Sequence, residues 1–266
     1  MKCTILGAGS PTYQLPYTKN THLPAYLLED GEDCILFECT ENMVTRLSEI
    51  SVPLSRLSTV AITHVHLDHF QLPALVLSLF CTKIAGGQIS DILTVYAPQE
   101  VIRAYYAIMD LQVPDRKGRG FEYPQITFVP VSDSNNRTGS LTLMSKPVYH
   151  GNGAVESVAY RVEKQGKIVA YSGDCGMCEG IKTIARDADL FLCDSSVQIG
   201  DFSSSSKYGH FNPFEVGIVC KEAGVKRVVL VHYAGYDLPE AMITECKRSG
   251  FTGEVICGQD YMTYEV

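Results

Sequence analysis

The sequence predicts an α/β protein of layered sheets and helices, and three observations indicate it. Short apolar or β-branched runs alternate with longer segments of helical pattern along the 266 residues. The first half of the chain contains strands with one or two helices, and the second half repeats that order. The side chains best suited to bind metal ions stand just after predicted strands, which indicates a layered fold with its site at strand ends.

In the first half of the chain, short apolar runs predict strands at residues 2–6, 25–29, 34–38, 59–63, 93–96, 126–130 and 141–147. Asp30 and Gly31 predict a hairpin turn between the second and third of these strands. Helices are predicted at 40–50, 72–81 and 98–109, with Thr40 as the N-cap of the first and Pro98 in the first turn of the third. Residues 132–140 are expected to form a turn rich in Ser and Asn.

In the second half, strands are predicted at 158–163, 167–171, 190–193, 227–231 and 254–257, the first two joined around Gln165 and Gly166. Helices are predicted at 180–186, 212–223 and 238–249. Asn212, Pro213 and Glu215 give the second of these helices a strong start, with Asn as the cap and Glu three residues later. The Ser-rich residues 203–206 are expected to be mobile and to lie outside these elements.

Length and composition predict one domain over residues 1–266, in a cytoplasmic protein. No apolar run approaches the ~20 residues of a membrane helix, and the N-terminus enters a strand without a signal peptide. The ten cysteines are scattered, several of them in apolar runs, so buried free thiols are expected. The net charge of −8 argues against a general nucleic-acid surface. The basic cluster of Arg116, Lys117 and Arg119 falls in a polar loop at 110–123, and whether this loop covers a site is left open.

Four metal-capable side chains directly follow the strand at 59–63. His64, His66, Asp68 and His69 fall within six residues, which suits a tight loop rather than one continuing strand face. Imidazole and carboxylate are the ligands that zinc-like ions take. Three of the other four histidines, His150, His210 and His232, also follow or flank apolar runs. The remaining histidine, His22, is interpreted as structural rather than functional.

These residues resemble the metallo-β-lactamase superfamily of dinuclear metal hydrolases. The motif from His64 to His69 resembles the family signature, and His150, Asp174 and His232 match the later ligands in order. The resemblance implies an αββα sandwich, two sheets face to face with helices outside and the metals at one edge. It implies two divalent ions, with His64, His66 and His150 on one, Asp68, His69 and His232 on the other, and Asp174 bridging. Zinc is favoured on ligand type, manganese and iron also fit, and the nucleophile would be a metal-bridging hydroxide. Cys175 and Cys178 are interpreted as incidental.

Within the superfamily, the sequence is most similar to the ribonuclease Z-like phosphodiesterases. The segments at residues 6–10, 20–21, 26–28 and 37–41 resemble that branch, as does Asp194 followed by His210. The resemblance implies that Asp68, Asp194 and His210 are catalytic. Asp194 would orient His210, and His210 would protonate the leaving oxygen.

The chain also departs from that branch. Only residues 151–173 separate the third His motif from Asp174, so the inserted arm that tRNA-processing members carry there is absent. The preferred function is therefore hydrolysis of a small or nucleotide-like phosphodiester, with nucleic acid less favoured and no membrane partner. The alternatives are a ribonuclease Z-like RNA endonuclease, a hydrolase of a lactone, thioester or sulfate ester, and a non-hydrolytic metal-binding or redox protein. A homodimer is left open.

Overall fold

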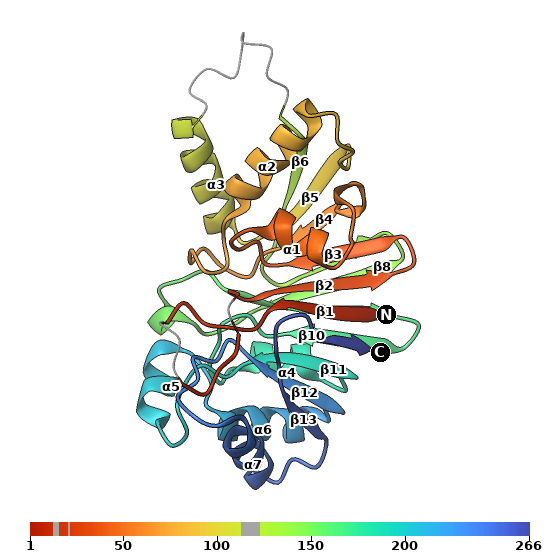
Figure 1. Ribbon diagram of the computed structural model, residues 1–266. Helices are drawn as coiled ribbons and strands as arrows, with labels where there is room; N and C mark the ends of the chain where they lie inside the picture. The colour runs from red at the N-terminus through yellow and green to blue at the C-terminus, as the bar shows by residue number, and fades with distance from the viewer. Residues whose placement is uncertain (13–15, 21, 113–122) are drawn as a thin grey trace.

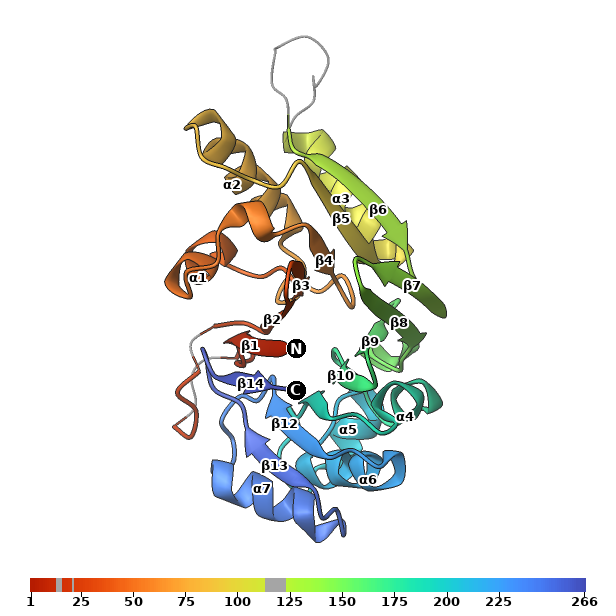
Figure 2. The same ribbon diagram turned by 90° about the vertical axis from the view of Figure 1, so that its right-hand side faces the viewer.

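The structure is a computed structural model that describes residues 1–12, 16–20, 22–112 and 123–266. Two sheets lie face to face, and helices cover the outer face of each (Figures 1 and 2). The predicted αββα sandwich is therefore confirmed. The two termini lie side by side at the edge of the molecule opposite α5 (Phe202–Tyr208), where Val266 N–H donates to Met1 O at 2.9 Å.

Among the described residues, each sheet has seven strands, and both sheets mix parallel and antiparallel pairs. The first sheet runs in the order β14 (Thr263–Glu265), β1 (Lys2–Gly7), β2 (Ala25–Asp30), β3 (Asp33–Phe37), β4 (Thr59–Ala61), β5 (Ile92–Ala97) and β6 (Gln125–Pro130). The second runs β13 (Glu254–Cys257), β12 (Arg227–Val231), β11 (Leu190–Asp194), β10 (Lys167–Tyr171), β9 (Val158–Lys164), β8 (Leu141–Pro147) and β7 (Ser134–Thr138). Strands β3 to β6 are parallel to one another, as are β10 to β13, so each half brings several strand ends to one edge.

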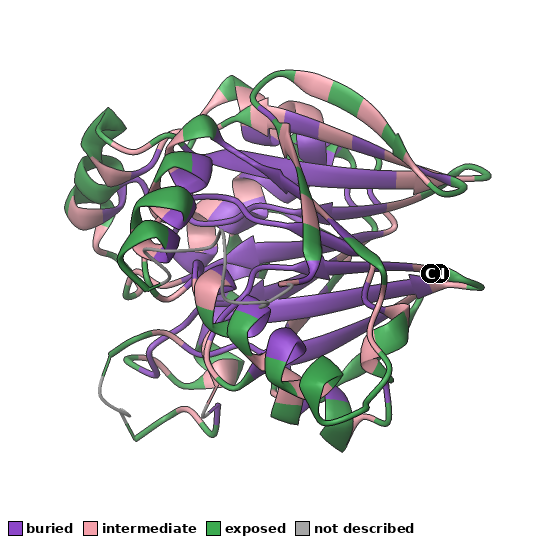
Figure 3. Ribbon diagram, turned by 90° about the horizontal axis from the view of Figure 1, so that it is seen from above, coloured by how far each residue is buried: buried purple, intermediate pink, exposed green. Residues whose placement is uncertain are grey.

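The remaining helices are α1 (Met43–Glu49), η1 (Leu54–Arg56), α2 (Leu72–Ile84), α3 (Gln99–Gln112), η2 (Gly151–Gly153), α4 (Glu179–Ala185), α6 (Pro213–Ala223) and α7 (Pro239–Arg248). Three apolar cores join the four layers. The first lies between the first sheet and α1, α2 and α3, and the second between the second sheet and α4, α6 and α7. The third fills the space between the two sheets, which explains why inner strands such as β2, β9 and β11 are almost continuously buried (Figure 3), whereas the edge strands β6 and β7 are not.

One helix was not predicted, and one prediction about a polar segment was wrong. Residues 203–206, which were expected to be mobile, lie in α5, whose N-cap Asp201 accepts a hydrogen bond from Ser204 N–H at 3.0 Å. The turn expected at 132–140 contains an edge strand, β7, which pairs antiparallel with β8. Serine and asparagine do not favour a helix or a strand on their own, so capping and pairing decide here.

The predicted cap of the first helix was also wrong. α1 begins after Asn42, which has a φ of +52° and makes no capping side-chain bond. Thr40 is buried, and its Oγ1 accepts a hydrogen bond from the guanidinium of Arg46. The buried Arg46 also donates to the carbonyls of Leu6, Leu23 and Glu41, so it joins the start of the chain to α1.

The other predicted elements are confirmed, with ends that differ by a few residues. The capping box at Asn212 is present, since Glu215 N–H donates to Asn212 Oδ1 at 3.1 Å. The short strand β14 was not predicted. The basic residues Arg116, Lys117 and Arg119 lie outside the described residues.

Candidate active site

The seven predicted metal ligands lie together where strands of both sheets end. His64, His66, Asp68 and His69 follow β4, and His150 follows β8. Asp174 follows β10, and His232 follows β12 with a φ of +60°. The sandwich therefore joins a contiguous loop from the first half to three separate strand ends of the second half.

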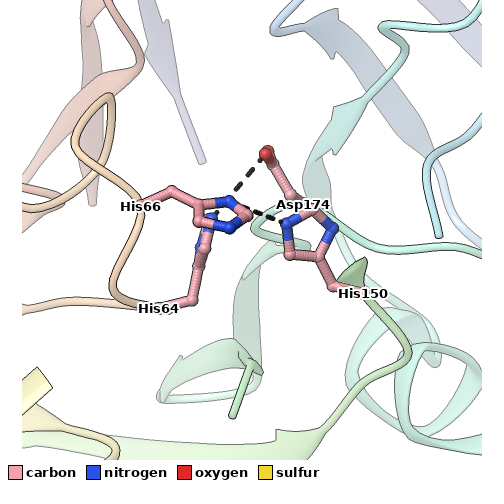
Figure 4. A group of neighbouring side chains, drawn as sticks. All are labelled: His64, His66, His150 and Asp174. Atoms are coloured by element: carbon pink, nitrogen blue, oxygen red, sulfur yellow. Dashed lines mark hydrogen bonds and ion pairs between the residues drawn. The ribbon is translucent and has the colours of Figure 1, made fainter. Parts of the chain in front are cut away.

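One group of four side chains contains His64, His66, His150 and Asp174, and Figure 4 shows them converging. The ring nitrogens His66 Nδ1 and His150 Nε2 lie 3.1 Å apart. His64 Nε2 lies 3.8 Å from Asp174 Oδ2. His150 is held from behind, because its Nδ1 lies 3.2 Å from the carbonyl of Gly209.

A second group contains Asp68, His69, His232 and again Asp174. His69 Nε2 lies 3.2 Å from Asp174 Oδ2 and 3.4 Å from His232 Nε2. His232 Nε2 lies 3.3 Å from Asp68 Oδ2 and 3.5 Å from Asp174 Oδ1. Asp174 thus belongs to both groups, with Oδ2 near His64 and His69 and Oδ1 near His232.

The donor atoms in each group are spaced as ligands of one ion. Two atoms at about 2.1 Å from a tetrahedral zinc ion are themselves about 3.4 Å apart. The separations of 3.1 to 3.8 Å match that spacing. Among the described residues, Nε2 of the fully buried His64 has no hydrogen-bond partner, which an ion would supply. The residues present therefore fit a pair of divalent ions.

The charges of the site favour a cation. Burial by itself would raise the pKa of the Asp174 carboxyl, but the charges of His232 and His69 hold that pKa well below its usual range. Burial together with the neighbouring imidazole of His69 holds the pKa of His64 well below its usual range, so this ring is neutral at pH 7. Burial would also lower the pKa of His232, yet the carboxylates of Asp174, Asp194 and Asp68 raise it to about 10. Without an ion, the proton on His232 balances these carboxylates.

Asp194 and His210 lie beside this cluster. His210 Nδ1 lies 2.8 Å from Asp194 Oδ2. Asp194 Oδ1 accepts a hydrogen bond from Ser196 N–H at 3.0 Å and lies 3.5 Å from His232 Nδ1. These two residues also form a metal-capable group with Asp174 and His232, but both oxygens of Asp194 already face donors. The geometry therefore suits an orienting carboxylate better than a further ligand.

Sequence analysis did not assign a role to Glu38, which is fully buried under the site. Its carboxylate accepts hydrogen bonds from Thr63 N–H at 3.2 Å and Thr63 Oγ1–H at 2.5 Å. Its Oε1 also lies 3.4 Å from His69 Nδ1, so it orients the ring whose other nitrogen faces Asp174. The available signal was an acidic residue at the end of a buried strand, directly before a helix start.

The other residues considered from the sequence lie apart from these two groups. His22 is half-exposed beside Tyr261 and Glu41. All ten cysteines are free thiols, and nine of them are buried or half-buried, as predicted. In the part of the chain that the structure describes, no helix is both long and apolar enough to cross a membrane.

Comparison with known proteins gives concordant results. The model of the β-lactamase superfamily domain matches residues 34–233. Ribonuclease Z of Metallosphaera sedula is 27% identical over 257 residues, covering 85% of this chain and 88% of that protein. The metallo-β-lactamase fold protein YhfI of Bacillus subtilis superposes with a TM-score of 0.77 at 22% identity, covering 100% of this chain and 99% of the other. The short form of human tRNase Z superposes with a TM-score of 0.74 at 20% identity, with the same coverage.

Proposed function

Because the chain belongs to the β-lactamase superfamily and is a metal-dependent hydrolase, we propose that it cleaves a nucleotide-like phosphodiester at a two-metal centre. The observation that carries this proposal is the Asp194–His210 pair beside the seven clustered side chains. Ester hydrolysis needs a nucleophile, charge stabilisation and a proton donor to the leaving oxygen. Ions held by the two groups of ligands would supply the nucleophile and the charge stabilisation, and the Asp194–His210 pair would supply the proton donor.

In this proposal, His64, His66 and His150 hold one ion, Asp68, His69 and His232 hold the other, and Asp174 contacts both. Zinc is the preferred ion, because three imidazoles or two imidazoles and a carboxylate are typical zinc ligand sets. A bound pair of such ions would polarise the phosphoryl group and lower the pKa of water near it. Glu38 and Gly209 position the rings of His69 and His150 from the far side.

His210 is the proposed proton donor. Its side chain is 20% exposed, so it can reach a substrate, whereas Asp194 behind it is 1% exposed. Burial would lower the pKa of His210, but the charge and hydrogen bond of Asp194 outweigh burial and raise it. This shift favours the protonated imidazole, whose Nε2–H is left to donate because Nδ1 faces Asp194.

A phosphodiester fits this site better than a thioester. The alkoxide that leaves a phosphodiester needs a proton, which His210 can supply, whereas the thiolate of a thioester leaves without one. The similarity to Ribonuclease Z of Metallosphaera sedula over 85% of the chain supports the same class of bond. We also propose that residues 1–266 act as one catalytic domain and that the buried free thiols reflect a cytoplasmic location.

The test combines metal analysis with turnover of bis-(p-nitrophenyl) phosphate. Protein purified without added metal should contain close to two zinc or manganese ions per chain and hydrolyse the diester. Asp68→Ala should lose about 10²-fold or more of the activity, and Asp91→Ala, at an exposed carboxylate away from the cluster, should lose none. Two metals without turnover would favour a lactone, thioester or sulfate ester. Less than one metal after reconstitution would contradict the two-metal centre, and iron absorbance would favour redox chemistry.

Cleavage of RNA is the second candidate, and the relatives named Ribonuclease Z favour it. Between His150 and Asp174, however, the chain forms only η2 and the β9–β10 hairpin, and no inserted arm extends from it. Incubation with a 3′-extended precursor tRNA tests this candidate directly. Cleavage at a single position, weakening steeply with salt, would support an RNA substrate.

A further inference from the structure

A hollow of about 580 Å³ lies where β5, β6 and β8 end and β9 begins, beside the ligand cluster. Pockets for small molecules have about this volume, roughly 300 to 1,000 Å³. Two backbone contacts connect it to the site. Val158 N–H donates to the carbonyl of Thr63 at 3.1 Å, and Thr63 directly precedes His64. Val148, which stands two residues before His150, donates its N–H to the carbonyl of Ser157 at 3.0 Å. The lining therefore stands within about 7 Å of chain from two ligands.

We propose that this hollow, the 98–158 pocket, binds the heterocyclic base of a nucleotide substrate while its phosphodiester lies at the ligand cluster. This inference rests on the proposed phosphodiesterase function and specifies which end of the substrate the protein recognises. The residues that line the 98–158 pocket fall into three sets. We call the buried ones the floor (Pro98, Val131, Ser157 and Val158), the more exposed apolar ones the walls (Pro130, Pro147, Val148 and Val155), and the remaining polar ones the rim (Gln99, Ser132, Asp133, Ser134 and Glu156).

The floor and walls suit a flat, weakly polar ring. Pro98, Val131 and Val158 are buried. Pro98, Pro130 and Pro147 have apolar rings and no backbone N–H group that would need a partner. Such a surface can pack against the face of a base without leaving donors unsatisfied. A polyanionic phosphate chain would gain nothing from it.

The rim suits a ligand that donates hydrogen bonds. Lys146 Nζ contacts Asp133 Oδ1 at 2.7 Å, and Glu100 N–H and Arg103 contact Glu156 at 2.9 and 3.7 Å. The carboxylates of Asp133 and Glu156 each already have one basic partner, so the rim does not need a cationic ligand to balance its charge. A carboxylate has about four acceptor positions, so both retain capacity for ring and amino N–H groups of a base.

Ser157 supplies an independent indication of a ligand. The residue is 6% exposed, and among the described residues its Oγ has no hydrogen-bond partner. A buried hydroxyl without a partner destabilises a protein, so such a group usually has one. A polar atom of a bound base would provide that partner.

The test is binding of guanosine and adenosine, which carry no phosphate, to the metal-loaded protein by calorimetry. Ser132→Trp places a large ring in the mouth from an exposed position, and the hydrogen bond from Ser145 Oγ–H goes to the Ser132 carbonyl rather than to its side chain. The variant should weaken nucleoside binding about tenfold or more. Ser48→Trp, at an exposed serine of α1 outside the pocket, should change it less than twofold and controls for the added tryptophan.

A kinetic arm compares thymidine 5′-(p-nitrophenyl phosphate) with methyl p-nitrophenyl phosphate, which lacks the base. Ser132→Trp should raise KM for the thymidine ester about tenfold and leave kcat/KM for the methyl ester unchanged. Absent nucleoside binding, or binding that Ser132→Trp leaves unchanged, would overturn the pocket. If neither ester is hydrolysed while Ser132→Trp still abolishes nucleoside binding, the proposed function fails and the base pocket stands.

Discussion

His210 Nδ1 lies 2.8 Å from Asp194 Oδ2, although the two residues come from different elements of the second half. Asp194 ends β11, and His210 stands between α5 and α6. The pair is placed next to the ligand cluster, with the ring of His210 centred 4.8 Å from that of His150. In the proposed function, this relationship would separate proton donation from metal binding.

Replacing His210 by alanine should lower kcat for a phosphodiester by about 10²- to 10⁴-fold, because the leaving oxygen loses its proton donor. Metal content by elemental analysis should not change. His22→Ala, at the histidine outside the ligand groups, controls for loss of an imidazole. A matching loss of one metal per chain would instead identify His210 as a ligand of the group that it forms with Asp174, Asp194 and His232.

Replacing Asp194 by asparagine should shift the alkaline limb of the kcat profile to lower pH. Burial lowers the pKa of His210, and Asp194 more than compensates and raises it. The protonated donor is present below its pKa and is lost as pH rises through it, so a lower pKa moves that loss to lower pH. Initial rates between pH 5 and 10 measure the limb. A profile that only falls in height, at an unchanged midpoint, would contradict the effect of Asp194 on the pKa of His210 and leave only its orienting role.

Asn212→Ala should lower the free energy of unfolding by about 1 kcal/mol, because it removes the acceptor of Glu215 N–H at the start of α6. Asn212→Asp keeps an acceptor at that position and should lose much less. Urea unfolding at pH 7.5 compares the three proteins. Equal losses in both variants would show that the side-chain acceptor at residue 212 is not what stabilises this end of α6.

Asp189→Ala should destabilise the protein at neutral pH but progressively less in acid. Burial by itself would raise the pKa of Asp189, but the hydrogen bond and charge of Lys226 and the bond from Ile168 N–H hold it below its usual range. A carboxylate with a lowered folded pKa stabilises above its unfolded pKa of about 3.9, and this stabilisation disappears as pH falls through the folded pKa.

Thermal unfolding of both proteins at pH 7 and at steps below the unfolded pKa of about 3.9, down to pH 2, measures this difference. At pH 7 the loss should be about 1.5 to 3 kcal/mol, the usual contribution of a hydrogen bond to a charged group. Asp91→Ala, at an exposed carboxylate of the first half of the chain, is the control. A difference that stays constant down to pH 3 would show that Asp189 acts through packing rather than charge.

Contiguous and strongly patterned features could be predicted from the sequence. The four candidate ligands between His64 and His69 fall within six residues of the chain, directly after a buried strand with β-branched residues. The motif therefore stands where the strand pattern predicts a site. Asn212 and Glu215 form a local capping box that needs no tertiary information. Local order therefore predicted both the loop and the cap.

Features that depend on tertiary contacts could not be predicted. Thr40 has the residue type of a cap but accepts from the buried Arg46, a contact set by packing with the start of the chain. In α5, Ser205 is buried, and its hydroxyl donates to His210 O and to Glu215, so distant partners stabilise a helix of weak propensity. Glu38 gained its role only when the fold brought it to Thr63 and His69.

The distribution of the ligands along the chain sets an order of events during synthesis. His69 and His232 meet at 3.4 Å in the folded protein but are separated by 163 positions. At roughly 5 to 20 residues per second, a ribosome needs about 8 to 33 s to translate that interval. The residues from His64 to His69 are therefore translated first, and the proposed two-metal centre would be complete only after β12 has been made.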